Sequence, residues 1–135
     1  MPATPICPAH LAHPAHAAHP AAADVTLDIE IERGALYFVL ECRGAHAHAV
    51  RVRFSRVIRD LAGLRVNDNP LFSQLEFMPA GRRVRLLVDT LAGFAKRRQP
   101  MQFKARLEWL GDDGKRARRT IGHDLAAWSQ LRETL

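Results

Sequence analysis

The sequence predicts an all-β protein, built as an antiparallel sandwich of two sheets with six or seven strands. Several short runs alternate apolar and polar residues, which is the period of a strand with one buried face. Turn signals rich in Gly, Pro, Asn and Asp separate these runs at intervals typical of a sandwich. Only the last residues show the three-and-four spacing of an amphipathic helix, so we expect one short helix at the C-terminus.

Length and composition favour one folded unit. The chain has 135 residues, of which 47% are apolar and 25% charged, enough for a single core. Residues 96–135 hold ten Lys or Arg against five Asp or Glu, so most of the net charge of +6 lies there. Such an excess permits attraction to an anionic partner without identifying one. Neither a membrane-spanning run nor a signal peptide is recognisable, and we expect a cytoplasmic, soluble protein.

The first segment, residues 1–23, is low in complexity and consists mostly of Ala, Pro and His. Four histidines recur at every third residue: His10, His13, His16 and His19. In a polyproline II helix they would share one edge, about 9 Å apart, too far to hold one metal ion without bending the chain. One interpretation is a tail that binds Zn, Ni or Cu, with Cys7 as a soft ligand. The other, which we favour, is a disordered extension.

From Asp24 onward the pattern changes to strands. Residues 24–32 alternate cleanly and carry an acidic outer face, and Arg33-Gly34 supplies a turn. Residues 35–43 and 48–54 are the most strongly patterned runs of the chain. Because Gly44 stands between them, we predict that they form a hairpin around which the rest of the sandwich is organised.

In this predicted hairpin, the residues that alternate with the core residues are partly apolar on the first strand and basic on the second. Tyr37 and Val39 indicate that the first strand is partly covered on both faces, as in the centre of a sheet. Arg51 and Arg53 must face water or an anionic partner, because an unpaired buried guanidinium costs several kcal/mol. Cys42 alternates with core residues and is predicted to be a small buried hydrophobe without a disulfide to Cys7.

Further strands are predicted at residues 71–78, 83–89, 101–109 and 115–121, the first of them as a short strand or an irregular crossover. The last is rich in arginine, which suits a sheet edge because charge discourages further strand pairing. Asp124 is expected to cap a short helix over residues 124–135. Its apolar residues lie three and four apart: Leu125, Trp128, Leu131 and Leu135.

Several turn motifs resemble those of a known family. Leu40-Glu41-Cys42-Arg43-Gly44, followed by Ala47-His48-Ala49-Val50-Arg51-Val52, is similar to the hairpin of bacterial immunoglobulin-like domains of the CARDB type. The resemblance continues at Met78-Pro79-Ala80-Gly81 and in Leu107-Glu108-Trp109 before Asp113-Gly114-Lys115. It implies an immunoglobulin-like sandwich over residues 24–123, which binds or spaces other molecules without catalysis. Cys42 departs from the Asn that this family has.

No motif points to an enzyme. Ser55, Ser73 and Ser129 lie in no nucleophile elbow, and the chain has neither a glycine-rich phosphate loop nor a His-Glu-x-x-His motif. His46 and His48 share a strand face and would form a metal site with His123 only if the fold brought the three together. We therefore predict a protein that is not an enzyme and has no cofactor.

The remaining functional signal is basic. Ten residues form the candidate polyanion site: Arg82, Arg83, Arg85, Lys96, Arg97, Arg98, Lys115, Arg116, Arg118 and Arg119. They would converge if the last strands were neighbours, although Phe103 and Trp109 alternate inward and would not stack on bases.

Three hypotheses for function follow from these patterns. The leading one is an interaction module that recognises another protein through an exposed strand face or edge. The first alternative is binding of nucleic acid or another polyanion through the basic strands. The second alternative is metal handling by the histidine-rich N-terminal tail.

Overall fold

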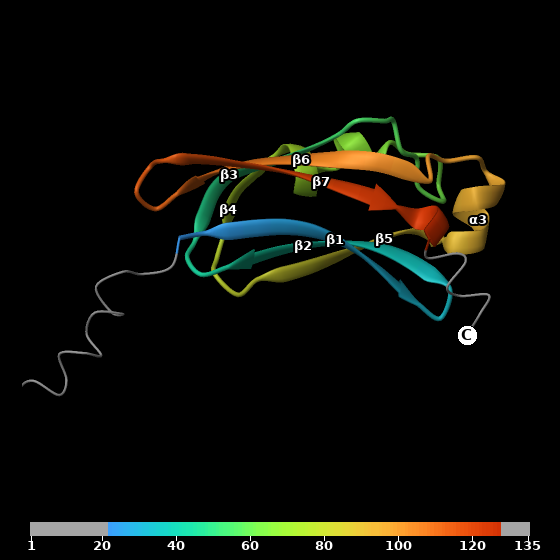
Figure 1. The fold of residues 1–135 in the computed structure, drawn as a ribbon, viewed down its shortest axis with the longest axis horizontal. Helices are drawn as coiled ribbons and strands as arrows, with labels where there is room; N and C mark the ends of the chain where they lie inside the picture. The colour runs from blue at the N-terminus through green and yellow to red at the C-terminus, as the bar shows by residue number, and fades with distance from the viewer. Residues whose placement is uncertain (1–21, 128–135) are drawn as a thin grey trace, which may run out of the picture.

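The computed structural model describes residues 22–127, which fold into two facing antiparallel sheets (Figure 1). Sheet A has the order β1-β2-β5, and its strands are β1 (Asp24–Glu32), β2 (Ala35–Arg43) and β5 (Arg83–Thr90). Sheet B has the order β4-β3-β6-β7, with β4 (Leu75–Met78), β3 (Ala47–Phe54), β6 (Gln102–Gly111) and β7 (Arg116–Asp124). The predicted all-β sandwich of six or seven strands is confirmed.

The predicted hairpin between β2 and β3 is wrong, although both strands exist. β2 lies in sheet A and β3 in sheet B, so the turn at Gly44 carries the chain from one layer to the other (Figure 1). The true hairpin joins β1 and β2 through Arg33 and Gly34, whose φ angles of 51° and 81° are those of a type I′ turn. Alternation tells which face of a strand is buried, but it does not tell which strand is its partner.

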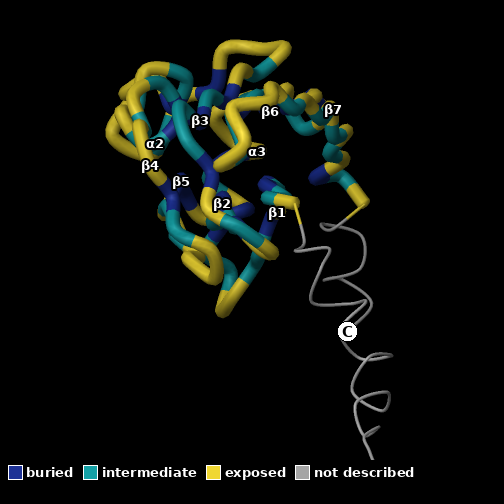
Figure 2. Tube along the Cα trace, turned by 90° about the vertical axis from the view of Figure 1, so that its left-hand side faces the viewer, coloured by how far each residue is buried: buried dark blue, intermediate teal, exposed yellow. Residues whose placement is uncertain are grey.

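The core forms where the two inner faces meet, and its centre is aromatic. Phe38 of β2 is fully buried and packs against Phe54 and Phe103 of sheet B, with ring centroids 5.7 and 5.6 Å away. Buried positions alternate with more exposed ones along β1 and β6 (Figure 2). Val39, on the outer face of β2, is also buried, which confirms that this strand lies at the centre of its sheet.

Cys42 also lies in the core, as predicted. Its side chain is fully buried, and the thiol donates a hydrogen bond to the carbonyl oxygen of Ala45 at 3.2 Å. Burial raises the pKa of the Cys42 thiol above its ordinary value, so the group stays protonated and unreactive at neutral pH.

Two short helices lie in connections that the sequence analysis treated as loops or strand. They are α2 (Pro70–Ser73) and α3 (Leu91–Lys96), and a 3-10 turn, η2 (Val66–Asp68), precedes the first. Asn69 caps α2 by accepting from the Leu71 N–H at 2.9 Å, and Thr90 caps α3 by accepting from the Gly93 N–H at 2.9 Å. An Asn-Pro step and a Thr before an apolar residue are capping signals that the sequence does contain.

β7 is an edge strand of sheet B, as its basic composition predicted. It lies beside β1, the edge of sheet A, and the two are joined by an ion pair of 2.6 Å between Arg119 and Asp24. After β7, the Asp124 carboxylate accepts from the Ala126 N–H at 3.0 Å, as expected of a helix cap, and residues 125–127 begin a helical turn. The rest of the predicted helix lies outside the described residues.

Among residues 22–127, none of the helices combines the length and the apolar character needed to cross a lipid bilayer.

Candidate functional site

The outer face of sheet B gathers cations from three neighbouring strands. Across the ladder, Arg53 of β3 pairs in register with Arg106 of β6, and Glu108 and Leu110 of β6 pair with Arg118 and Arg116 of β7. Residues paired in register project on the same face of a sheet. We call the following set the cationic face: Arg53, Lys104, Arg106, Arg116 and Arg118.

These cations are largely unneutralised within the described part of the chain. Arg106 has one carboxylate within ion-pair distance, Glu108, with 3.9 Å between Nε and Oε2. No described carboxylate lies within 4.0 Å of the other members of the cationic face. At the margin, Arg51 is neutralised by Glu76 at 2.6 Å and also donates to the Leu75 carbonyl oxygen at 3.1 Å. The cationic face therefore carries a net positive charge that the fold does not compensate.

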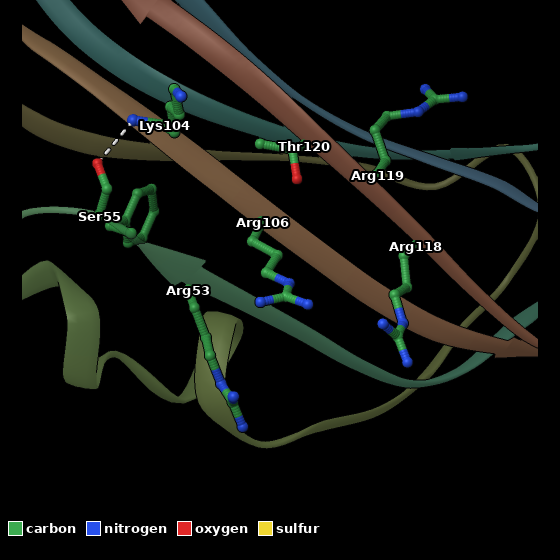
Figure 3. A pocket seen from close by; sticks show the side chains of 8 residues that line it. Arg53, Ser55, Lys104, Arg106, Arg118, Arg119 and Thr120 are labelled. Carbon is green, nitrogen blue, oxygen red and sulfur yellow. Dashed lines mark hydrogen bonds between the residues drawn. The ribbon is translucent and has the colours of Figure 1, made fainter.

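Two arginines of the cationic face occupy directly opposed positions on neighbouring strands. Like charges at directly opposed positions of an antiparallel pair destabilise a sheet by up to about 1 kcal/mol, and Arg53 and Arg106 occupy such positions. Figure 3 shows Arg53, Arg106 and Arg118 pointing to the same side of the sheet, from three adjacent strands. They line an open hollow of about 500 Å³. A repulsion between charges that destabilises the fold, and that no contact within the fold offsets, is typical of a binding surface.

The basic residues of β5, by contrast, form ion pairs within sheet A. Arg83 forms an ion pair with Glu30, and Arg85 lies 3.2 Å from Glu30 and 3.0 Å from Glu32. The Arg85 guanidinium also stacks over the Tyr37 ring at 3.8 Å. The acidic outer face of β1 therefore neutralises the arginines of β5 across the central strand of the sheet.

The ten basic residues predicted from the sequence consequently do not form one patch. Arg82, Arg83 and Arg85 belong to sheet A or its approach, and Lys96, Arg97 and Arg98 lie at the end of α3. Lys115 lies in the turn before β7, and Arg119 points inward to Asp24. Of the ten, Arg116 and Arg118 alone belong to the cationic face.

The contribution of β3 and β6 to the candidate site was not predicted from the sequence. Arg53, Lys104 and Arg106 alternate with the core residues Val52, Phe103 and Ala105. That alternation is the signal that places their side chains outward, and Arg53 was expected to face water or an anionic partner. The alternation does not predict that β3 and β6 are neighbours, because two strands and two short helices separate them in the sequence.

The hypothesis of a metal site formed by His46, His48 and His123 is wrong. His48 pairs with Leu110 near one end of β6, whereas His123 pairs with Phe103 near the other end. Seven residues of strand separate these two positions, or about 23 Å. Within residues 22–127 no three His, Cys, Asp or Glu side chains are grouped as metal ligands. His10, His13, His16 and His19 lie outside the described residues, so the hypothesis of a metal-binding tail stays a prediction.

His123 instead occupies the seam between the two sheets. Its ring packs against Phe103, with centroids 5.4 Å apart, and its Nε2 is buried without a hydrogen-bond partner among the described residues. Burial lowers the pKa of His123 below its ordinary value, although the Asp28 carboxylate and the Leu27 backbone of β1 oppose this shift. Protonation of His123 therefore places a charge at the junction of β1 and β7 that Asp28 and the Leu27 backbone offset only in part.

We expect this seam to weaken in acid. Because the pKa of His123 is lower in the folded chain than in the unfolded one, its neutral form supports full stability above about pH 6.5. Stability is then lost as the pH falls from there through the lowered folded-state pKa. Urea unfolding at pH 8 and pH 5 should show a smaller loss of stability in acid for His123→Phe than for the parent. Equal losses in the parent and His123→Phe would contradict this assignment.

No protein-family model, curated protein or solved structure matches this chain. The resemblance to CARDB-type immunoglobulin-like domains therefore stays a prediction.

Proposed function

We propose that this protein is a non-catalytic, immunoglobulin-like binding module, and that the outer face of sheet B binds a polyanion. The observation that carries the proposal is the opposed pair Arg53 and Arg106, within a face whose cations other than Arg106 have no described carboxylate within 4.0 Å. Guanidinium groups recognise phosphate, sulfate and carboxylate oxygens through paired hydrogen bonds, so a face rich in arginine suits such a ligand.

The dimensions of a sheet support the same function. Cations on adjacent strands are spaced by about 5 Å and those two residues apart on one strand by about 7 Å, so the cationic face is a dense, regular array. A polymer with closely spaced charges can contact several of these groups at once. Binding then releases its condensed counterions, which adds a favourable and salt-dependent contribution.

The test is a binding titration with fluorescein-labelled heparin, a polyanion without bases. At low salt we expect the double variant Arg53→Gln/Arg106→Gln to bind about ten-fold more weakly, which corresponds to about 1.4 kcal/mol of binding free energy. The slope of log K against log salt should decrease by about 1.5 to 2, because two contacts to the polyanion are lost.

The matched control is Arg83→Gln/Arg85→Gln, which removes the same charge from sheet A, where Glu30 and Glu32 already neutralise it. Its affinity for heparin should change less than about two-fold, since exposed and paired charges contribute little. Equal weakening by both double variants would mean that net charge alone attracts the polymer, and the proposal would be rejected.

A further inference from the structure

An aromatic group lies on the same outer face, at one end of the cationic face. Phe77 of β4 pairs in register with His48 of β3, His48 with Leu110 of β6, and Leu110 with Arg116 of β7. One transverse row of sheet B therefore runs from an aromatic ring to a member of the cationic face. Phe77 is 48% exposed, although a phenylalanine on a sheet usually packs its ring into the core.

Two imidazoles hold the Phe77 ring in place. The centroids of His46 and His48 lie 5.3 and 5.2 Å from that of Phe77. Each imidazole is fixed in turn, since His46 Nδ1 accepts from the Ala80 N–H at 2.9 Å and His48 Nε2 lies 2.8 Å from Asp112 Oδ1. The aromatic group is thus positioned before any ligand binds, which lowers the entropic cost of using it.

The distance between the aromatic group and the cations suits a polymer. His48 and Arg53 pair with Leu110 and Arg106, which are four residues apart on β6, or about 13 Å, a distance that a few nucleotides can span. Between the two regions lies a hollow of about 240 Å³, lined by Arg51, Arg53, Glu108, Leu110 and Arg116 among others. A chain lying along β3 could therefore contact the ring at one end and the guanidinium groups at the other.

The rest of the face favours nucleic acid over an acidic protein. Its central rows are charged or polar, namely Arg53, Arg106 and Thr120, and then Glu108 and Arg118. Interfaces between proteins have the opposite arrangement, an apolar core depleted in charge with a polar rim. Interfaces with nucleic acids are polar and strongly positive throughout, and aromatic rings in them stack on unpaired bases.

We infer that the polyanion is single-stranded nucleic acid, whose phosphates lie on the cationic face while a base stacks on Phe77. This inference rests on the proposed function and adds the chemical class of the ligand. A duplex would keep its bases stacked on each other, so Phe77 could not be used. Stacking on an aromatic side chain tolerates any base, so we expect weak sequence preference.

The test compares two probes, fluorescein-labelled oligo(dT) of about ten nucleotides and fluorescein-labelled heparin, with the full chain and its variants. Phe77→Ala should weaken oligo(dT) binding about ten-fold or more and leave heparin binding unchanged, because heparin has no bases. Phe77→Trp should restore oligo(dT) binding. The matched control is Leu87→Ala, which truncates an equally exposed apolar side chain on sheet A and should change neither affinity.

The outcomes separate this inference from the proposed function. If Phe77→Ala leaves oligo(dT) binding unchanged while Arg53→Gln/Arg106→Gln weakens both probes, stacking is rejected and the polyanion-binding face stands. Tighter binding of a duplex with the same number of phosphates would also reject the single-strand inference. If the double arginine variant weakens neither probe, both proposals are rejected.

Discussion

Replacement of Phe38 by Ala is expected to destabilise the fold by about 3 to 5 kcal/mol, the usual cost of truncating a fully buried phenylalanine. Phe38 lies on the central strand of sheet A and contacts the rings of Phe54 and Phe103 in sheet B. Its removal opens a cavity between the layers and also loses the aromatic contacts, which contribute about 0.5 to 1.5 kcal/mol beyond buried area. A domain of this size has only about 5 to 15 kcal/mol of stability, so the loss is a large fraction of it.

Urea unfolding followed by circular dichroism measures this effect. The more conservative change Phe38→Leu should lower the free energy of unfolding by clearly less than Phe38→Ala does, because most of the side-chain volume is kept. Leu87→Ala serves as the surface control and should stay within about 0.5 kcal/mol of the parent, since the side chain is half exposed. A cost below about 1 kcal/mol for Phe38→Ala would mean that the two sheets do not pack through this ring.

Replacement of Arg97 by Met is expected to have the second large effect and to lower the free energy of unfolding by about 3 kcal/mol. The carboxylate of Asp89 is 1% exposed, and Arg97 is its cation, with 2.5 Å between Nη1 and Oδ2. The other oxygen of Asp89 accepts from the Thr90 N–H at 2.7 Å, at the start of α3. Without Arg97, a buried negative charge keeps only a backbone partner, and this residual charge is what destabilises the variant.

A double-mutant cycle with Asp89→Asn tests the pairing. Asp89→Asn alone should cost about 1.5 to 3 kcal/mol, the contribution of hydrogen bonds to a charged group. The double variant should cost less than the sum of the single variants, because the buried charge disappears together with its cation. Lys96→Met is the matched control, since Lys96 is an exposed neighbour on the same helix that has no carboxylate within 4.0 Å in the described chain. Equal costs for Lys96→Met and Arg97→Met would contradict the role of this ion pair.

Gly93 shows why the ion pair and the helix depend on each other. A β-carbon at this position would lie 2.5 Å from Arg97 Nη1 and 2.7 Å from Asp89 Oδ1 and Thr90 Oγ1. The same small volume therefore contains the helix cap and both charged groups, and only a residue without a side chain leaves room for them. The sequence pattern of residues 89–97 does not predict that the helix cap and the ion pair share this space, because their proximity depends on the burial of Asp89.

The candidate site could be predicted only in part. The outward direction of Arg53, Lys104 and Arg106 follows from alternation with core residues, and the edge position of β7 follows from its arginines. Phe77 could not be found in this way, since an apolar residue in a short strand is expected to face the core. Its exposure follows from its register with His48 at the edge of sheet B.

The sequence by itself determined the strands, most of the turns and the face of each strand that is buried. These features follow from local properties, namely the period of two along an extended chain and the conformations that Gly and Asp allow at turns. The β1–β2 turn at Arg33-Gly34 is one example, and the burial of Cys42 is another.

The tertiary structure alone decided which strands are partners. β2 and β3 were predicted to pair with each other, yet they lie in different sheets, and β3 pairs with β6 from much later in the chain. Alternating strands with similar patterns can pair in several ways, and the choice depends on which arrangement buries the most apolar surface across the whole molecule. That long-range choice neutralises the arginines of β5 with Glu30 and Glu32. It also brings Arg53 of β3 together with Arg116 and Arg118 of β7 on one face, where none of the three has a described carboxylate within 4.0 Å.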